Sequence, residues 1–367
     1  MTATSERIDY MDAARSVLMS LGVVLHSARP FAPGTPWLIR DPAVLPLFGW
    51  IVDFIHLFRM PAFFFISGFF CALTLERYGA GRFLRQRLPR LVLPLATVAL
   101  LFNVPQMLWL IDLELLPSPG LRAWLDGEAW VLHLWFLLNL ILYFTVAAAV
   151  GPRALDGVRG IAARLPRADG LPGALLLVAG ALAVFLLVLP LAFAGLLYER
   201  AWIFGTWLGL VRFFCPFIIG FAAMSDMRLR DAWFRYGWIT LVLALAARVA
   251  ADRLPGDQGT FVDLLALHWG DLAATWVTLL LFRALVTGPS AFWRYMSDAS
   301  YSLYLLHHPV ILVLGVGLLT VPIGIGWKFA LLCAGGLALP LAAHHFIVLR
   351  VPAARWLFSG RAPARSG

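Results

Sequence analysis

The sequence predicts an all-α polytopic membrane protein, a bundle of about ten transmembrane helices with both termini cytoplasmic. Three observations predict this fold class: the composition, the number of long apolar runs, and the distribution of arginine. Of the 367 residues, 61% are hydrophobic and only 13% are charged, with a mean hydropathy of +0.84. A soluble domain is closer to half apolar and a quarter charged, so this composition excludes an ordinary globular protein.

Ten apolar runs, each bounded by charged residues, proline or glycine, account for nearly the whole chain, which we treat as a single transmembrane domain, 1–367. A membrane-spanning helix needs about 20 mostly apolar residues. The predicted spans are 10–28, 47–75, 90–111, 129–150, 172–195, 201–224, 235–252, 263–286, 299–319 and 326–349. The proline- and glycine-broken stretch 151–171 is either a hinge between two helical halves or an ordinary cytoplasmic loop.

Positive charge is unevenly distributed between the predicted loops. With a cytoplasmic N-terminus, nineteen of the 29 Lys and Arg residues fall in inner loops and tails, six in outer loops and four inside spans. Cytoplasmic loops carry this excess in membrane proteins, so both termini are expected on the cytoplasmic side, with an even number of spans. The same bias explains the net charge of +9 without nucleic acid as a partner. The three cysteines lie in apolar runs without CxxC spacing, which is typical of buried free thiols.

The first predicted helix carries ionisable residues, which are costly inside a span and therefore indicate function. Asp12, Arg15, Met19, Gly22 and His26 recur at 3,4,3,4 spacing, so they form one stripe along the helix. His26 lies about three turns, roughly 16 Å, beyond Arg15. The stripe is either a polar path that ends at a proton-accepting imidazole, or an interhelical salt bridge with an interfacial histidine.

The second predicted helix carries Asp53, His56 and Arg59 at i, i+3 and i+6. Three such residues in one span are expected to face an aqueous cavity or one another, because contact with lipid is costly. Asp53 or His56 is then expected near His26. A purely structural triad is the alternative.

Arginines crowd the predicted loop between the second and third spans, more densely than orientation alone requires. They are Arg77, Arg82, Arg85, Arg87 and Arg90. The guanidinium fork binds phosphate through several hydrogen bonds at once, so a cytoplasmic nucleotide or coenzyme A is a candidate ligand. The alternative is that these arginines only set the orientation of the chain.

The remaining histidines show no spacing of a metal site. His133 lies beside the aromatic Trp135, and His307 and His308 follow Tyr304 in the ninth predicted span. None has the acidic residues of a transition-metal site around it, and adjacent histidines on a helix are expected to point to different faces, so no metal is predicted. The chain also has no GxSxG elbow, Walker loop or GxGxxG motif. Any chemistry must therefore use histidine, carboxylate and arginine inside the bundle.

These motifs occur in an order that resembles the membrane acyltransferase 3 superfamily, and within it the OpgC (MdoC) branch, which succinylates osmoregulated periplasmic glucans. The matching stretches are Asp9–Arg15 with His26, Asp53–Met60 with Phe64–Gly68, His133–Leu138, Ser302–Pro309 and Arg350–Gly360. Together they extend over nearly the whole chain, and the family's bundle of about ten spans agrees with the arginine distribution.

The resemblance implies roles for individual residues. His26 matches the family's histidine and would be the general base. Arg87-Leu-Pro-Arg90 matches the family's RxxR motif for the coenzyme A phosphates, and Arg82-Phe-Leu-Arg85 is a second copy. Arg15 would help on the donor side.

The resemblance therefore implies an inner-membrane O-acyltransferase that moves a succinyl group from cytoplasmic succinyl-CoA to hydroxyls of a periplasmic glucan. Arg59 or His56 is the candidate oxyanion donor, and both direct attack and a covalent acyl-histidine remain open. The expected partners are acyl-CoA as donor substrate, the glucan acceptor and membrane lipid, with no permanently bound cofactor. The aromatic-rich surface is compatible with a homodimer.

The alternative function is a secondary transporter for an organic anion. In that case Asp53, His56 and Arg59 would form the coupling site, and the loop arginines would only orient the chain. Transporters often contain two related halves. The second half of this chain does not repeat the pattern of its first two spans, which favours the enzyme.

Overall fold

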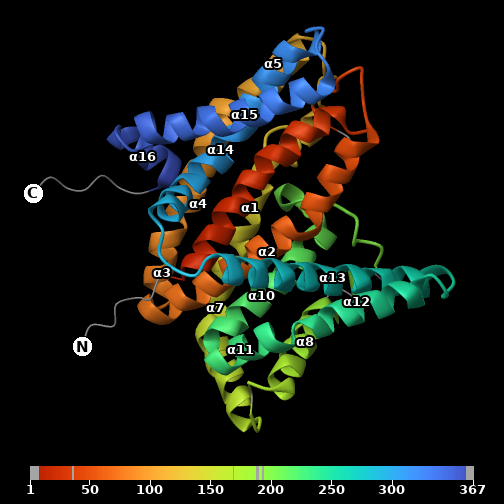
Figure 1. Cartoon of the computed structure of the whole chain (residues 1–367), viewed down its shortest axis with the longest axis vertical. Helices are drawn as coiled ribbons and strands as arrows, with labels where there is room; N and C mark the ends of the chain where they lie inside the picture. The colour runs from red at the N-terminus through yellow and green to blue at the C-terminus, as the bar shows by residue number, and fades with distance from the viewer. Residues whose placement is uncertain (1–7, 35–36, 168, 187–189, 192–193, 361–367) are drawn as a thin grey trace, which may run out of the picture. The chain divides into compact units, whose positions relative to one another are not determined.

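The computed structural model describes residues 8–34, 37–167, 169–186, 190–191 and 194–360. These residues are mostly helical, with no β-strand among them beyond an isolated bridge between Arg200 and Thr206. The predicted all-α fold class is confirmed. The helices, the longer of which are labelled in Figure 1, are α1 (Asp9–Ala28), η1 (Arg29–Phe31), α2 (Pro46–Tyr78), α3 (Ala80–Arg87), α4 (Pro89–Val98), η2 (Ala99–Asn103), α5 (Val104–Asp112), α6 (Leu121–Leu125), η3 (Leu132–Leu134), α7 (Trp135–Arg164), α8 (Leu171–Leu186), η4 (Trp202–Phe204), α10 (Trp207–Ser225), α11 (Met227–Tyr236), α12 (Trp238–Ala251), α13 (Gly256–Leu285), α14 (Ala291–Leu319), α15 (Ile325–Ala343), η5 (His344–Val348) and α16 (Pro352–Ser359).

Seven helical segments of the described chain are long and apolar enough to cross a membrane. They are Pro46–Tyr78, Ala80–Asp112, Leu132–Arg164, Trp207–Ser225, Gln258–Leu285, Ala291–Leu319 and Ile325–Val348. An eighth span results if α11 and α12, which meet at an angle of 52°, cross together. The chain is therefore a multi-pass membrane protein. The predicted count of ten spans and the cytoplasmic position of both ends are not confirmed.

The two remaining predicted spans, α1 and α8, are helical but are not among the segments that are long and apolar enough to cross a membrane. The helix α1 has 20 residues, but its first two turns carry Asp9, Asp12 and Arg15. The helix α8 has 16 residues, and the rest of predicted span 172–195 includes positions 187–189 and 192–193, outside the described residues. The stretch 151–171 is mostly helical, because α7 continues to Arg164.

The described chain divides into two compact units, and α1, α2, α3 and α7 each contribute residues to both. Unit 1 is drawn from Met1–Ala14, Leu57–Arg85 and Leu142–Gly288. Unit 2 is drawn from Arg15–His56, Gln86–Ile141 and Pro289–Gly367. Each unit is assembled from stretches far apart in the sequence.

Unit 2 is built around the second part of α1, the first part of α2, α14 and α15. Their buried apolar side chains form one cluster, which includes Val23, Val52, Ile311 and Leu332. The helices α14 and α15 form a hairpin, and Gly336 allows close approach, since a Cβ there would lie 2.7 Å from Val23 Cγ1. This packing fixes the position of α1 relative to α14.

Unit 1 contains the hairpin of α12 and α13, which run side by side in Figure 1. The second part of α2 packs closely on α10 through two glycines. A Cβ at Gly68 would lie 1.9 Å from the Phe217 carbonyl oxygen, and one at Gly220 would lie 2.0 Å from that of Phe65. Small residues at helix crossings are typical of membrane bundles, because they let two backbones approach closely.

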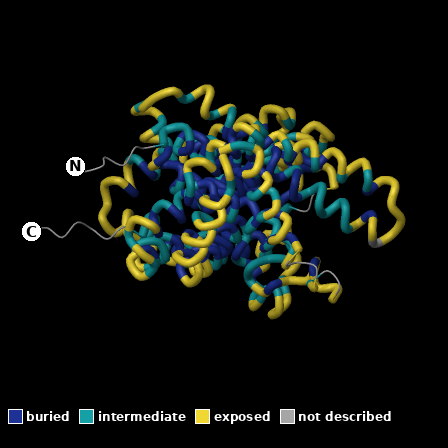
Figure 2. Tube along the Cα trace, turned by 90° about the horizontal axis from the view of Figure 1, so that it is seen from below, coloured by how far each residue is buried: buried dark blue, intermediate teal, exposed yellow. Residues whose placement is uncertain are grey.

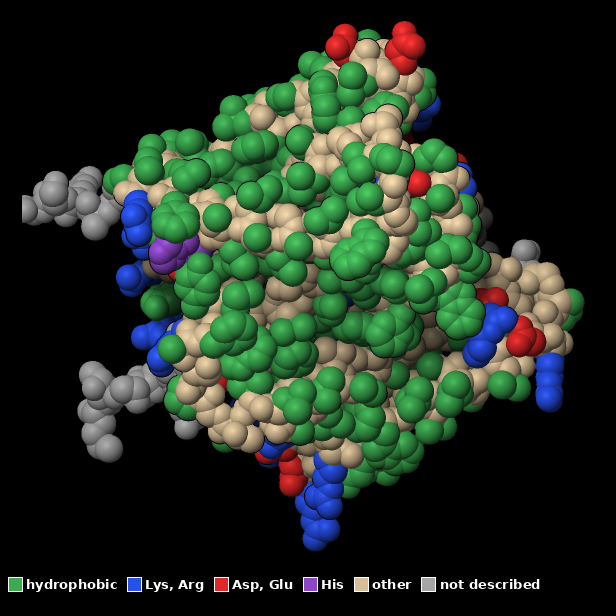
Figure 3. Space-filling model, turned by 45° about the horizontal axis from the view of Figure 1, so that its top comes forward, with side chains coloured by type: hydrophobic (Ala, Val, Ile, Leu, Met, Phe, Trp, Pro, Cys, Tyr) green, Lys and Arg blue, Asp and Glu red, His purple; other side chains and the backbone are tan. Residues whose placement is uncertain are grey.

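The helices are buried on one side and exposed on the other, as the alternating colours along the tubes of Figure 2 show. Many large apolar side chains are exposed, among them Trp50, Leu100, Leu245 and Trp327. On the face drawn in Figure 3, hydrophobic side chains cover most of the surface and charged ones appear mainly near its edges. In a membrane protein this apolar surface contacts lipid.

Candidate active site

The helices α1 and α14 run side by side in the same direction through unit 2, and two contacts fix their register. At one end, Arg15 Nη2 donates a hydrogen bond of 2.5 Å to Ser297 Oγ. At the other end, the rings of His26 and His307 lie 5.2 Å apart. Each contact is ten or eleven residues from the other along its helix, which corresponds to roughly 16 Å of rise. The proposed donor end and the histidine end are therefore separated along one helix pair.

The backbone of the predicted coenzyme A motif lies at the Arg15 end of unit 2. Tyr301, one turn beyond Ser297, donates a hydrogen bond of 2.7 Å from its hydroxyl to the Arg90 carbonyl. Gly360, in a left-handed conformation, packs directly on the Arg90 backbone. Arg15 and Arg90 are thus anchored on the same segment of α14.

Four histidines gather at the other end of this helix pair. The His26 ring lies 5.2 Å from His307 and 5.4 Å from His308. The His133 ring stacks on His308 at 4.5 Å and lies 5.5 Å from His307. His133, His307 and His308 are buried, and His26 is partly exposed. We call these four residues the histidine cluster.

Backbone carbonyls fix the tautomers of two members of the histidine cluster. His307 Nδ1 lies 2.7 Å from the Tyr304 carbonyl oxygen, and His133 Nε2 lies 3.3 Å from that of Leu305. A carbonyl can only accept, so these nitrogens carry the protons and the opposite ring nitrogens are acceptors. Tyr304 also donates a 2.6 Å hydrogen bond to the His133 carbonyl. The cluster is therefore held in a defined orientation.

The expectation that His307 and His308 point to different faces is only half right. Their rings are 6.5 Å apart and nearly perpendicular, as expected for neighbours about 100° apart around a helix. Both rings nevertheless contact His26 and His133, because α1 and η3 lie against this side of α14. His307 and His308 therefore belong to the same group of contacting rings.

The segment that follows α1 adds an indole and a guanidinium to the histidine cluster. The Trp37 ring stacks on His26 at 5.0 Å and contacts the edge of His308 at 5.1 Å. Arg29 Cζ lies over the Trp37 ring, 5.1 Å from its centroid, and Arg29 Nη2 lies 3.2 Å from His56 Nε2. Burial lowers the pKa of Arg29 from its usual value. His26 and Arg29 therefore both contact the Trp37 ring.

The loop that carries Trp37 is closed by a buried ion pair. Lys328 Nζ donates a 2.7 Å hydrogen bond to Asp41 Oδ2, and both side chains are at most 6% exposed. Sequence reasoning did not single out Trp37, Asp41 or Arg29. Lys328 was a usable signal, because it is the chain's single lysine and lies in an otherwise apolar stretch.

The other predicted site residues lie elsewhere. Asp53 is exposed on α2, whereas its neighbour His56 contacts Arg29. Arg59 is buried in unit 1. The remaining predicted residues of unit 1 are Asp12, partly buried on α1, and Arg82 and Arg85, exposed on α3. Arg87 and Arg90 belong to unit 2.

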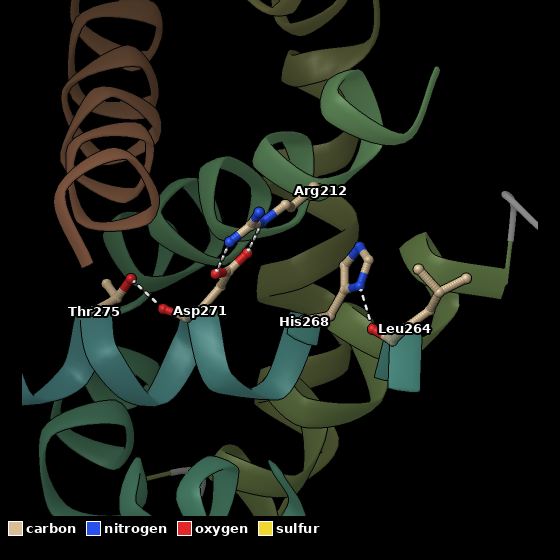
Figure 4. Close-up of polar contacts among 5 residues, drawn as sticks. All are labelled: Arg212, Leu264, His268, Asp271 and Thr275. Atoms are coloured by element: carbon tan, nitrogen blue, oxygen red, sulfur yellow. Dashed lines mark hydrogen bonds and ion pairs between the residues drawn. The ribbon is translucent and has the colours of Figure 1, made fainter. Parts of the chain in front are cut away.

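Unit 1 holds a second buried polar group, drawn in Figure 4. Arg212 of α10 makes two hydrogen bonds to Asp271 of α13, at 2.6 and 2.8 Å, and Asp271 is almost fully buried. One turn earlier on α13, His268 Nδ1 lies 2.6 Å from the Leu264 carbonyl. Nothing in the sequence pattern pairs Arg212 with Asp271, since 59 positions separate them.

The residues that the structure describes contain no group of three His, Cys, Asp or Glu side chains arranged to hold a metal ion. Within the histidine cluster, His133 stacks on His308, whereas the His26 ring is tilted against His307 and edge-on to His308. Arg15 and Arg90, two of the predicted donor-binding residues, belong to unit 2 and lie at the opposite end of the helix pair.

Comparison with known proteins identifies the family. The family model described as an acyltransferase domain matches residues 8–345. Glucans biosynthesis protein C of Salmonella paratyphi B is 28% identical over 385 residues, covering 97% of this chain and 95% of the relative. The same protein of Salmonella gallinarum is 29% identical over 388 residues with equal coverage. No solved structure matches the chain significantly. The match extends over nearly all of the sequence, and the chain belongs to the acyltransferase 3 family of membrane proteins.

Proposed function

We propose that this protein is an inner-membrane O-acyltransferase that moves a succinyl group from cytoplasmic succinyl-CoA to hydroxyls of a periplasmic glucan. The observation that carries the proposal is the histidine cluster, in which the partly exposed His26 contacts the buried His307 and His308 and the Trp37 ring. Membership of an acyltransferase family and similarity to glucans biosynthesis protein C support the reaction class.

The chemical step is a transfer from sulfur to oxygen. His26 accepts the proton of a sugar hydroxyl, and the oxygen attacks the thioester carbonyl carbon. The carbon–sulfur bond breaks, and the leaving thiolate takes the proton to give free coenzyme A. The product is the succinyl ester, so atoms and charge balance without a cofactor. A route through an acyl-histidine would give the same products.

The negative charge that develops on the carbonyl oxygen needs a donor nearby. His56 is our first candidate, because it belongs to unit 2 with His26 and contacts Arg29. Arg59, three residues further along α2, is the second. His307 and His308 contact the base and are proposed to orient it, and His133 and Tyr304 hold these two rings in place.

The donor is proposed to enter at the opposite end of α1. Arg87 and Arg90 would hold the coenzyme A phosphates, assisted by Arg82 and Arg85, and Arg15 would lie next to the pantetheine arm. The roughly 16 Å of rise between Arg15 and His26 is the length that the arm has to bridge.

The test is coenzyme A release by the purified protein in detergent. Succinyl-CoA is supplied with and without β-glucan, and free thiol is measured for wild type, His26→Ala and His345→Ala. His345 is the matched control, because it contacts Tyr295 and Phe346 rather than the histidine cluster. General-base catalysis is typically worth 10²–10⁴-fold, so we expect His26→Ala to lose glucan-dependent release by about that factor.

The outcome also separates the enzyme from the transporter. Release that depends on glucan and on His26, but not on His345, supports the acyltransferase. If wild type neither binds nor consumes succinyl-CoA, and proteoliposomes accumulate labelled organic anions instead, the protein is a transporter and the acyl-transfer proposal is wrong.

A further inference from the structure

Arg29 is a cation beside the proposed base with no carboxylate to balance it. Its side chain is partly buried, and in the described chain no Asp or Glu oxygen lies within ion-pair distance of it. The two contacts of its guanidinium are the Trp37 ring face and His56 Nε2. By contrast, the cations Lys328 and Arg212 both hold a buried aspartate.

Two hydrogen-bond donors at this position lack an acceptor in the described structure. Arg29 Nε and Trp37 Nε1 are both buried and have no hydrogen-bond partner. A buried donor without a partner typically costs about 1–3 kcal/mol. The same donors, on a guanidinium stacked over an indole, form a preorganised cradle for a planar anion. The loop that carries Trp37 is held in place by Asp41 and Lys328.

The position of Arg29 on the helix pair indicates which anion it would bind. Arg29 lies three residues after His26, whereas Arg15 and Arg90 are anchored at the far end of α1 and α14. In the proposed function, the phosphates of coenzyme A occupy that far end. The anion next to His26 must then be on the acyl group itself, since the thioester carbonyl has to reach the base.

We infer that Arg29 and Trp37 bind the terminal carboxylate of a dicarboxylic acyl group and thereby select succinyl over uncharged acyl groups. The inference rests on the proposed function and names the residues that set its donor specificity. The carboxylate of a succinyl group is three carbon–carbon bonds, about 4 Å, from the thioester carbonyl. The His26 ring centroid and Arg29 Cζ lie 5.0 and 5.1 Å from the centroid of the same Trp37 ring, so they are at most about 10 Å apart. A four-carbon acyl chain of about 4 Å, with a hydrogen bond of about 3 Å at each end, spans that distance.

The experiment compares two donors of equal chain length. Butyryl-CoA has a methyl group where succinyl-CoA has its carboxylate, so the ratio of their kcat/KM values measures recognition of that carboxylate. The ratio is determined for wild type, Arg29→Met, Arg29→Lys and Arg40→Met. Arg40 is the matched control, because it lies exposed in the same loop.

A charged hydrogen-bonded pair is worth roughly a 10- to 100-fold change in affinity. We therefore expect wild type and Arg40→Met to prefer succinyl-CoA, and Arg29→Met to lose about 10- to 100-fold in kcat/KM with that donor. With butyryl-CoA, Arg29→Met should lose much less activity than with succinyl-CoA, so the ratio of the two kcat/KM values falls, and the remaining butyryl-CoA turnover also reports that the variant is folded. Arg29→Lys keeps the positive charge but not the forked pair of donors, so its kcat/KM with succinyl-CoA is expected to lie between those of wild type and Arg29→Met.

Several results would overturn the inference while leaving the proposed function intact. One is an equal fall in kcat/KM of Arg29→Met with both donors, which would indicate a general catalytic or structural role. Another is a succinyl-CoA to butyryl-CoA ratio of kcat/KM that stays at the wild-type value in both Arg29 variants. If wild type turns over neither donor, the proposed function itself fails, and the donor selection with it.

Discussion

Individual residues divide the proposed site into a proton-accepting end and a phosphate-binding end. His26 is held by ring contacts with His307, His308 and Trp37, and the tautomer of His307 is fixed by a backbone carbonyl. A base whose neighbours have fixed tautomers presents its acceptor nitrogen in one direction. At the other end, Arg15 and Arg90 are tied to neighbouring turns of α14.

The residue-scale prediction concerns the phosphate-binding end. Arg87→Ala combined with Arg90→Ala should raise the KM for succinyl-CoA about 10- to 100-fold, with kcat changed only a few-fold, because charged hydrogen bonds to phosphate act in binding. Steady-state kinetics with varied donor provide the measurement. Arg253→Ala, exposed in a predicted outer loop, is the control and should keep the wild-type KM. An equal fall in kcat with KM unchanged would contradict this role.

Spacing along one helix predicted the stripe from Asp12 to His26, but not which side of the second helix is used. Three residues turn an α-helix by about 300°, which is about 60° less than a full circle. Two such steps separate Asp53 from Arg59, so their side chains point roughly 120° apart. This explains why Asp53 is exposed, His56 contacts Arg29 and Arg59 is buried. Trp37 and Arg29 were missed because loop residues carry no periodicity.

At the scale of helices, the crossing of α2 and α10 depends on two glycines. Gly68 of α2 faces the α10 backbone, and Gly220 of α10 faces the α2 backbone. Gly68→Ala or Gly220→Ala would place a Cβ about 2 Å from a carbonyl oxygen, which only separation of the helices can relieve. We expect either change to lower the midpoint of thermal unfolding in detergent by several degrees, since overpacking typically costs about 1–3 kcal/mol.

Gly180→Ala in α8 is the matched control for this prediction, because no atom lies within 4 Å of the added Cβ. Replacing glycine by alanine inside a helix is then neutral or stabilising by about 0.5–1 kcal/mol. Equal behaviour of Gly180→Ala and Gly68→Ala would show that the close crossing of α2 and α10 does not contribute to stability.

Helix positions were largely predictable, because each of the ten predicted spans corresponds to helical structure in the described chain. Long apolar runs fix helices in a membrane, where every backbone group needs an internal partner. Whether a helix crosses fully was not predictable from hydropathy alone. The charges at the start of α1 and the short α8 leave seven clear spans, or eight with the bent pair α11 and α12.

At the scale of the whole molecule, a buried ion pair joins distant segments in each unit: Arg212 with Asp271 in unit 1, and Lys328 with Asp41 in unit 2. Removing one partner leaves an uncompensated buried charge, which typically costs about 3–5 kcal/mol. We expect Arg212→Met and Lys328→Met each to lower thermal stability in detergent markedly. The paired variants Arg212→Met/Asp271→Asn and Lys328→Met/Asp41→Asn should recover much of that loss.

The exposed pair Arg122 and Asp126 provides the comparison, because the Arg122 side chain is 93% exposed. Exposed pairs contribute at most about 1 kcal/mol, so Arg122→Met should have little effect. If the paired variants are less stable than Arg212→Met and Lys328→Met alone, the ion pairs rather than the unpaired charges provide the stability. The pairing itself could not be predicted, since it joins residues 59 and 287 positions apart.

The central claim is that one chain transfers an acyl group from coenzyme A on one side of a membrane to a sugar on the other. The most direct measurement uses sealed proteoliposomes with β-glucan in the lumen and succinyl-CoA, labelled in the succinyl group, added outside. We expect ester-linked label on luminal glucan with wild type and none with His26→Ala. Label that appears only when glucan and succinyl-CoA share a compartment, or equally with His26→Ala, would contradict transfer across the membrane at His26.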